Sequence, residues 1–164
     1  MFYREGDLCV AHLSVEESQV LRQCSAEMAE LLSDRLDRDD PVVGRLFPDV
    51  YTDDAAAAQE LRRLTEVDLK EHKRSQVARM LVDLPPHGGE VRLDDEGAES
   101  WLRALTDLRL ALAMRLDIRD DTDIESELDD AVLRDPTSSR VGRLSIYGYL
   151  SVLQQSLIES VTGD

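Results

Sequence analysis

The densest run of apolar positions in the chain lies between residues 101 and 116. These positions recur at helical spacing on more than one face: Trp101, Leu102, Leu105, Leu108, Leu110, Leu112 and Leu116. A surface helix buries a single stripe, so a helix with this pattern must be covered from several sides. The pattern predicts a central helix of an all-helical domain, with Asp94 as its N-cap and its end near Asp117.

The first 13 residues have the pattern of a β-hairpin, with two short extended segments separated by a turn at Gly6. A helix is predicted to follow, because Ser14 and Glu17 form a capping box in which each side chain accepts a hydrogen bond from a free backbone amide. Its apolar residues lie on one face, and we expect it to end near Leu36.

Residues 41–51 combine a glycine and prolines with apolar side chains, which predicts an ordered loop. A second helical region is predicted to begin at a cap formed by Thr52 or Asp53. This region is either one helix to Leu84 or two helices with a break at Thr65, and the sequence leaves both alternatives open.

Residues 85–94 hold two prolines and two glycines, which predict a turn, and Val91–Leu93 form a short extended segment that can pair with the hairpin. Carboxylates dominate residues 120–130, so this segment is predicted to be mobile apart from one helical turn around 124–133. A last helix over 139–161 is predicted to pack on the central helix.

These elements predict a mainly all-α fold, a single-domain bundle of about four to five helices with a small N-terminal β-hairpin. A length of 164 residues is that of one ordinary domain. The predicted domain, 1–164, divides into an extended hairpin (1–13), a first helical half (14–84), a turn and short strand (85–94) and a second helical half (95–164).

The chain is strongly acidic, with a formal net charge of −16. A field of this sign repels nucleic acids and anionic lipids at long range. The sequence also lacks a secretory signal and any apolar run of the roughly 20 residues that span a membrane. We therefore expect a cytoplasmic protein without membrane contact, whose partner is a protein rather than DNA.

No stretch has the residue spacing of a metal site, a nucleophilic triad or a phosphate loop. The acidic segment 120–130 lacks the glycine and the terminal glutamate of a calcium loop. His12, His72 and His87 are scattered over predicted elements of different kinds. We expect no catalytic residue, no cofactor and no metal, and hence a protein that is not an enzyme.

Cys9 and Cys24 are too few for a disulfide scaffold. Cys9 lies roughly 16 Å before the predicted junction of strand and helix, and Cys24 lies roughly 15 Å after it. If the chain reverses at this junction, the two cysteines can lie side by side. One interpretation is a redox pair whose disulfide pins the hairpin to the first helix. We favour the other, that both are inert packing residues, because buried cysteines usually serve packing alone.

The main basic cluster lies in the second helical region and offers candidate nucleic-acid contacts: Arg62, Arg63, Lys70, Lys73 and Arg74. A DNA-reading helix presents such charges on one face. Acidic residues are interleaved here at spacings that favour ion pairs within a helix, such as Glu66 with Lys70. We therefore favour an ion-paired surface over DNA contact.

Two further groups are structural candidates. Arg103, Asp107 and Arg109 on the central helix predict a polar network, in which Arg103 pairs with Asp107 and Arg109 reaches a carboxylate on another helix. Aromatic residues that can contact a partner or a second copy are Trp101, Tyr147 and Tyr149. A homodimer is therefore among the predictions.

Three segments resemble an actinobacterial family, DUF2017: Leu46–Tyr51 with Leu61–Thr65, then Glu90–Leu93, then Trp101–Leu110. The resemblance implies a small, mainly helical intracellular protein that acts as a transcriptional regulator responding to oxidants. Thr106 stands where the family pattern has asparagine. The cysteines here are widely separated, so redox sensing by a close cysteine pair is not carried over.

The function that the sequence favours is a non-enzymatic cytoplasmic regulatory protein, similar to an oxidative-stress transcriptional regulator and acting mainly through protein contacts. One alternative is a DNA-binding regulator that uses the basic segment 62–79. Another is a small-ligand-binding protein or an enzyme of unknown reaction.

Overall fold

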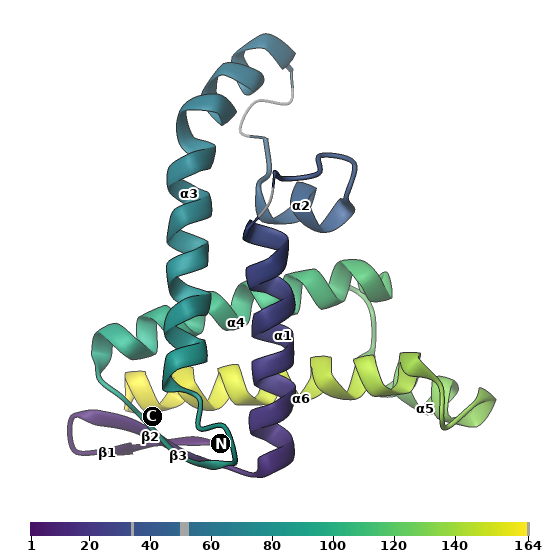
Figure 1. The fold of residues 1–164 in the computed structure, drawn as a ribbon. Coiled ribbons are helices and arrows are strands. Elements are labelled where there is room, and N and C mark those ends of the chain that lie inside the picture. Colours follow the sequence, from purple (N-terminus) through teal and green to yellow (C-terminus); the bar gives the residue numbers. More distant parts are fainter. Residues whose placement is uncertain (34, 50–52, 164) are drawn as a thin grey trace.

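The computed structural model describes residues 1–33, 35–49 and 53–163, which form six helices and a three-stranded sheet (Figure 1). The mainly α fold with an N-terminal hairpin is confirmed, although the helices number six rather than four to five. In chain order the elements are β1 Phe2–Glu5, β2 Leu8–Leu13, α1 Val15–Ser33, α2 Pro41–Leu46, α3 Ala55–Asp83, β3 Gly89–Leu93, α4 Asp95–Leu116, α5 Ile124–Arg134 and α6 Ser139–Thr162.

The sheet is antiparallel in the order β1-β2-β3, so the short extended segment predicted after the prolines does pair with the hairpin. Cys9 lies opposite Leu93 and Ala11 opposite Val91, and all four side chains are buried. One face of the sheet therefore belongs to the core, where β1 and β2 contact α6.

The turn before β3 depends on Gly88, whose φ of +74° is favourable only for glycine. A Cβ atom there would lie 2.9 Å from the backbone carbon of Ser14 and 2.9 Å from the backbone nitrogen of Val15. Gly88→Ala should therefore lower the free energy of unfolding by more than about 1 kcal/mol, measured by urea denaturation.

The matched control is Gly142→Ala in α6, where an added Cβ meets nothing within 4 Å. Alanine at a helix interior is favoured over glycine, so this variant should gain about 0.5–1 kcal/mol. Equal effects of the two substitutions would refute the steric argument.

Helix α1 begins as predicted. The backbone amide of Ser14 donates to Glu17 Oε2 over 2.7 Å, and the amide of Glu17 donates to Ser14 Oγ over 3.1 Å. The helix ends at Ser33, short of the predicted Leu36.

The loop predicted over residues 41–51 is wrong in its first part, where Pro41–Leu46 form helix α2. Asp40 caps this helix by accepting from the amide of Val42 over 2.8 Å, and proline is favourable in the first turn because it needs no amide partner there. Residues 50–51 lie outside the described residues.

Helix α3 is continuous from Ala55 to Asp83, so the alternative with a break at Thr65 is wrong. Thr65 Oγ1 instead donates to the carbonyl of Leu61 within the helix, over 2.9 Å. The cap is Asp54 rather than Asp53, and the other predicted cap, Thr52, lies outside the described residues.

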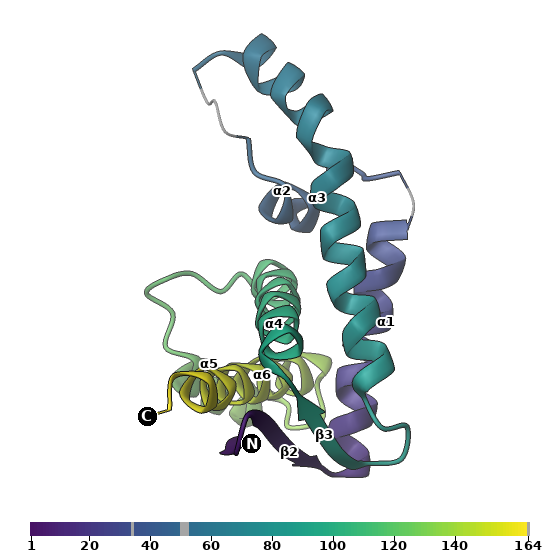
Figure 2. The same cartoon turned by 90° about the vertical axis from the view of Figure 1, so that its left-hand side faces the viewer.

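Helix α4 is central as predicted, with Asp94 as its N-cap, and it contacts α1, α2, α3, α6 and the sheet. Helices α1 and α3 run antiparallel and side by side, and together we call them the arm (Figures 1 and 2). Arg22 of α1 donates to the carbonyls of Leu81 and Leu84 over 3.1 and 3.0 Å, which satisfies the C-terminal end of α3. The first part of α3 extends past the end of α1 (Figure 1).

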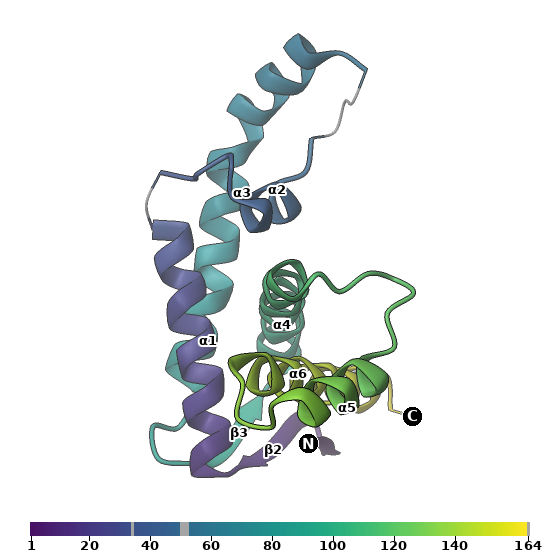
Figure 3. The ribbon, with the colours of Figure 1, turned by 90° about the vertical axis from the view of Figure 1, so that its right-hand side faces the viewer.

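Helix α5 packs beside α6 at the side of the molecule away from the first part of α3 (Figure 3). The predicted mobile segment with one helical turn is therefore wrong, because residues Ile124–Arg134 form a helix of 11 residues that is capped by Asp123. An ion pair of 2.7 Å between Glu127 and Arg140 joins this helix to α6. None of the helices within residues 1–33, 35–49 and 53–163 has the length and apolar character needed to cross a lipid bilayer.

Candidate functional site

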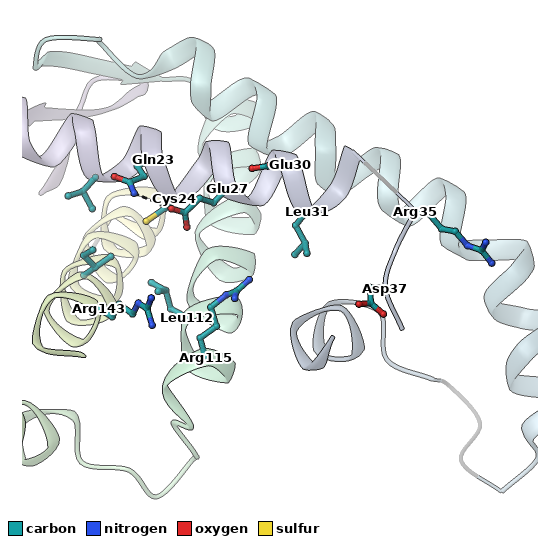
Figure 4. A pocket seen from close by; sticks show the side chains of 12 residues that line it. Gln23, Cys24, Glu27, Glu30, Leu31, Arg35, Asp37, Leu112, Arg115 and Arg143 are labelled. Carbon is teal, nitrogen blue, oxygen red and sulfur yellow. Dashed lines mark hydrogen bonds between the residues drawn. The ribbon is translucent and has the colours of Figure 1, made fainter. Parts of the chain in front are cut away.

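A groove of about 620 Å³ lies between the arm and the two helices α4 and α6 (Figure 4). Helix α1 forms one wall, and α4 and α6 form the other. The lining residues are Val20, Gln23, Cys24, Glu27, Glu30, Leu31, Arg35, Asp37, Leu112, Arg115, Arg143 and Ile146.

The two walls carry opposite charges. Glu27 and Glu30 lie on α1, whereas Arg115 of α4 and Arg143 of α6 lie on the other side (Figure 4). Glu27 accepts a hydrogen bond of 3.1 Å from Gln23. Within the described residues, the guanidinium groups of Arg115 and Arg143 make no hydrogen bond or ion pair with another side chain.

Aliphatic side chains lie between the charged walls: Val20 and Leu31 from α1, Leu112 from α4 and Ile146 from α6. A surface with apolar character between rims of opposite charge suits an amphipathic segment better than a small polar molecule.

Cys24 lines this groove and is half-buried, while Cys9 is fully buried in β2. Burial raises the pKa of the Cys24 thiol to about 11, and Glu27 adds to the effect. A thiol with this pKa is protonated at neutral pH and a weak nucleophile. Both cysteines are free thiols, so the structure contains no bond between the predicted redox pair.

Asp107 lies in the interface of α3 and α4, where Lys73 Nζ donates to its Oδ1 over 2.7 Å. The aspartate is only 4% exposed, and its Oδ2 has no hydrogen-bond partner among the described residues. Burial raises the pKa of Asp107, and Lys73 acts in the opposite direction. The predicted pair of Arg103 with Asp107 is wrong, because Arg103 is on the exposed side of α4 and pairs with Glu99 there.

Arg109 does reach another helix, but its acceptors are neutral. Its Nε donates to Ser151 Oγ over 3.0 Å, and its Nη1 donates to Gln154 Oε1 over 2.7 Å. Gln154 in turn donates to Thr106 Oγ1 over 2.7 Å. The predicted carboxylate is therefore replaced by a hydroxyl and an amide, which join α4 to α6.

Most of the basic cluster on α3 is paired with carboxylates. Arg63 pairs with Glu60 and Arg74 with Glu71 within the helix, at 2.9 and 3.0 Å. The others pair across elements: Arg62 with Asp49, and Lys73 with Asp107. Lys70 is not free either. Glu66, expected to pair with Lys70, is bound to Arg38.

The three aromatic candidates occupy different environments. Trp101 is fully buried and belongs to the core, so it presents no surface to a partner. Tyr147 is half-buried, with its ring 5.4 Å from the Arg109 guanidinium. Burial raises the pKa of Tyr149, and the nearby carboxylate of Glu17 adds to the effect. Gly148 between them has open space beside its Cα.

The groove is not evident from the sequence. Cys24 is predicted to be a packing residue, and nothing in the pattern of α4 or α6 connects Arg115 with Arg143. Only the packing of these helices brings the two arginines to the same wall. Among the described residues, no group of three or more His, Cys, Asp or Glu side chains could hold a metal ion.

Comparison with known proteins gives one family and several relatives. A family model described as a domain of unknown function, DUF2017, matches residues 1–161. The AosR protein of Mycobacterium leprae is 32% identical over 134 residues, covering 73% of this chain and 58% of the relative. Proteins named oxidative stress regulator AosR from Mycobacterium bovis and Mycobacterium tuberculosis are 28% identical over 148 residues, covering 70% of this chain and 68% of each relative. No solved structure matches the chain.

Proposed function

The chain belongs to the DUF2017 family, and we propose that it is a cytoplasmic, non-enzymatic regulator of the oxidative-stress response that binds another protein in the groove between α1, α4 and α6. The regulatory role is supported by the names of the relatives. The chain spans 58% of the length of the Mycobacterium leprae protein. That this chain has the regulatory activity of the whole relative is therefore part of the proposal.

The observation that carries the proposal is the pair of unpartnered arginines in the groove. The chain has 35 acidic and 19 basic residues, so carboxylates are abundant. Arg115 and Arg143 nevertheless have no acidic partner within the described residues. An incoming acidic side chain would therefore meet two guanidinium groups without first displacing another ion pair.

The proposed occupant is an amphipathic helix of a partner protein. Its aliphatic ridge would contact Leu31, Leu112 and Ile146. Acidic residues on one flank would face Arg115 and Arg143, and basic residues on the other would approach the α1 wall. Charges arranged in this way fix the orientation of a bound helix and exclude partners of the wrong sign.

The experiment places a photo-crosslinking amino acid at Gln23, which is exposed in the groove, and in a second protein at Leu133, which is 84% exposed on α5. In cells, the Gln23 position should give a discrete protein adduct that the Leu133 position does not give. Peptide mapping of the adduct should identify a helix with acidic residues along one flank.

Reversal of the arginine charges tests the same site. Arg115→Glu with Arg143→Glu should abolish the adduct and the transcriptional response to peroxide in cells that lack the endogenous protein. Arg45→Glu with Arg134→Glu changes the net charge equally outside the groove and should preserve both. Equal loss in the two variants, an unchanged adduct after groove reversal, or an adduct with nucleic acid would contradict the proposal.

A further inference from the structure

A second surface lies on the side of α3 that faces away from α1 and α4. We call it the outward face of α3. Apart from the neighbours Arg63 and Leu64, its residues follow one another at steps of three or four positions, so they form one stripe along the helix: Ala56, Glu60, Arg63, Leu64, Val67, Glu71, Arg74, Ala78 and Val82. The buried residues of the helix, Ala58, Val77 and Met80, lie on the other side.

The outward face contains large apolar side chains without cover. Leu64 is 64% exposed, Val67 is 66% exposed and Val82 is 82% exposed. Single exposed apolar residues are ordinary, but three in line on one helix indicate a contact surface. The first part of α3 extends past the end of α1 (Figures 1 and 2).

The charges on this face identify the occupant. Along the helix the order is acid, base, Leu64, Val67, acid, base, formed by the ion pairs Glu60 with Arg63 and Glu71 with Arg74. In an antiparallel pair of copies related by a twofold axis at Val67, Glu60 faces the Arg74 position and Arg63 faces the Glu71 position. Every charge therefore meets its opposite, whereas a parallel pair in register would oppose like charges.

We propose that two copies of the chain associate through the outward face of α3, antiparallel and centred near Val67. Leu64 and Val67 of each copy form the apolar centre, and the four charged residues on each side form the flanks. Such an isologous contact needs only one patch that is complementary to itself. The surface is separate from the groove, so this dimer is independent of the proposed function.

Complementary charge variants test the contact by analytical ultracentrifugation. Glu60→Arg with Glu71→Arg makes the charged positions wholly basic, and Arg63→Glu with Arg74→Glu makes them wholly acidic. Each variant alone should weaken self-association by about tenfold or more, because like charges then face each other. An equimolar mixture of the two should form dimers again, and circular dichroism should show that both variants fold.

Cysteine crosslinking tests the position of the twofold axis. In a Cys24→Ser background, Val67→Cys should form a disulfide-linked dimer under mild oxidation, and Leu133→Cys on α5 should not. A wild-type monomer, a mixture that stays monomeric, variants that remain dimeric, or equal crosslinking at the two positions would overturn the proposal.

Discussion

Trp101→Ala should lower the free energy of unfolding by about 3–5 kcal/mol, a large fraction of the stability of a domain of this size. Trp101 is fully buried in α4, and its ring meets the ring of Phe2 edge to face with centroids 5.6 Å apart. Its Nε1 donates to Asp83 Oδ2 over 2.9 Å. Truncation leaves a cavity where β1, α3 and α4 meet.

Trp101→Phe separates packing from hydrogen bonding, because it keeps most of the apolar contact and loses the bond to Asp83. Its cost should be smaller than that of alanine. The chain has one tryptophan, so urea denaturation of these variants must be followed by circular dichroism rather than fluorescence.

The control is Leu133→Ala, at an exposed site of α5, which should change the free energy of unfolding by less than about 0.5 kcal/mol. A similar small change for Trp101→Ala would contradict its place in the core.

Lys73→Met should cost about 3–5 kcal/mol at neutral pH, because it leaves the buried carboxylate of Asp107 without its cation. The double variant Lys73→Met with Asp107→Leu should recover much of this loss, since an apolar pair of similar volume replaces the ion pair. Urea denaturation of the wild type and both variants measures the two effects. A double variant less stable than Lys73→Met would refute the charge argument.

The loss of unfolding free energy in Lys73→Met should depend on pH, because the protonation of Asp107 contributes to it. Burial raises the pKa of Asp107 above the ordinary value of 3.8, so the folded state holds this proton to higher pH than the unfolded state. The contribution of Asp107 to stability therefore falls as pH rises through that window. Lys73 lowers the same pKa, so its removal widens the window. The deficit of Lys73→Met relative to the wild type should shrink as pH falls toward 3.8, and the double variant should show no such change.

Features that depend on neighbouring residues were predictable from the sequence. The capping box of Ser14 and Glu17 and the Asp94 cap of α4 each need only a few adjacent positions. The breadth of the apolar surface of α4 likewise predicted its central place. Family membership was also predictable, because the resemblance rested on ordered segments along most of the chain.

Features that depend on packing were not predictable. Helical spacing predicts Arg103 as the partner of Asp107. In the structure Asp107 lies in the interface of α3 and α4, where it pairs with Lys73 of α3, and Arg103 pairs with Glu99. The glycine and prolines around α2 suggested a loop, although Asp40 and Pro41 also fit a helix start. The groove forms where α1, α4 and α6 meet. The sequence of α4 or α6 alone therefore does not indicate that Arg115 and Arg143 lie on the same wall.

The side-by-side packing of α1 and α3 has a consequence for the two proposed binding events. Helix α1 is a wall of the groove, α3 carries the outward face, and the two helices pack against each other, so the two separate surfaces are connected through the arm. If self-association changes the affinity of the groove by some factor, thermodynamic reciprocity requires a groove occupant to change self-association by the same factor. A regulator built in this way would couple its own concentration to the capture of its partner.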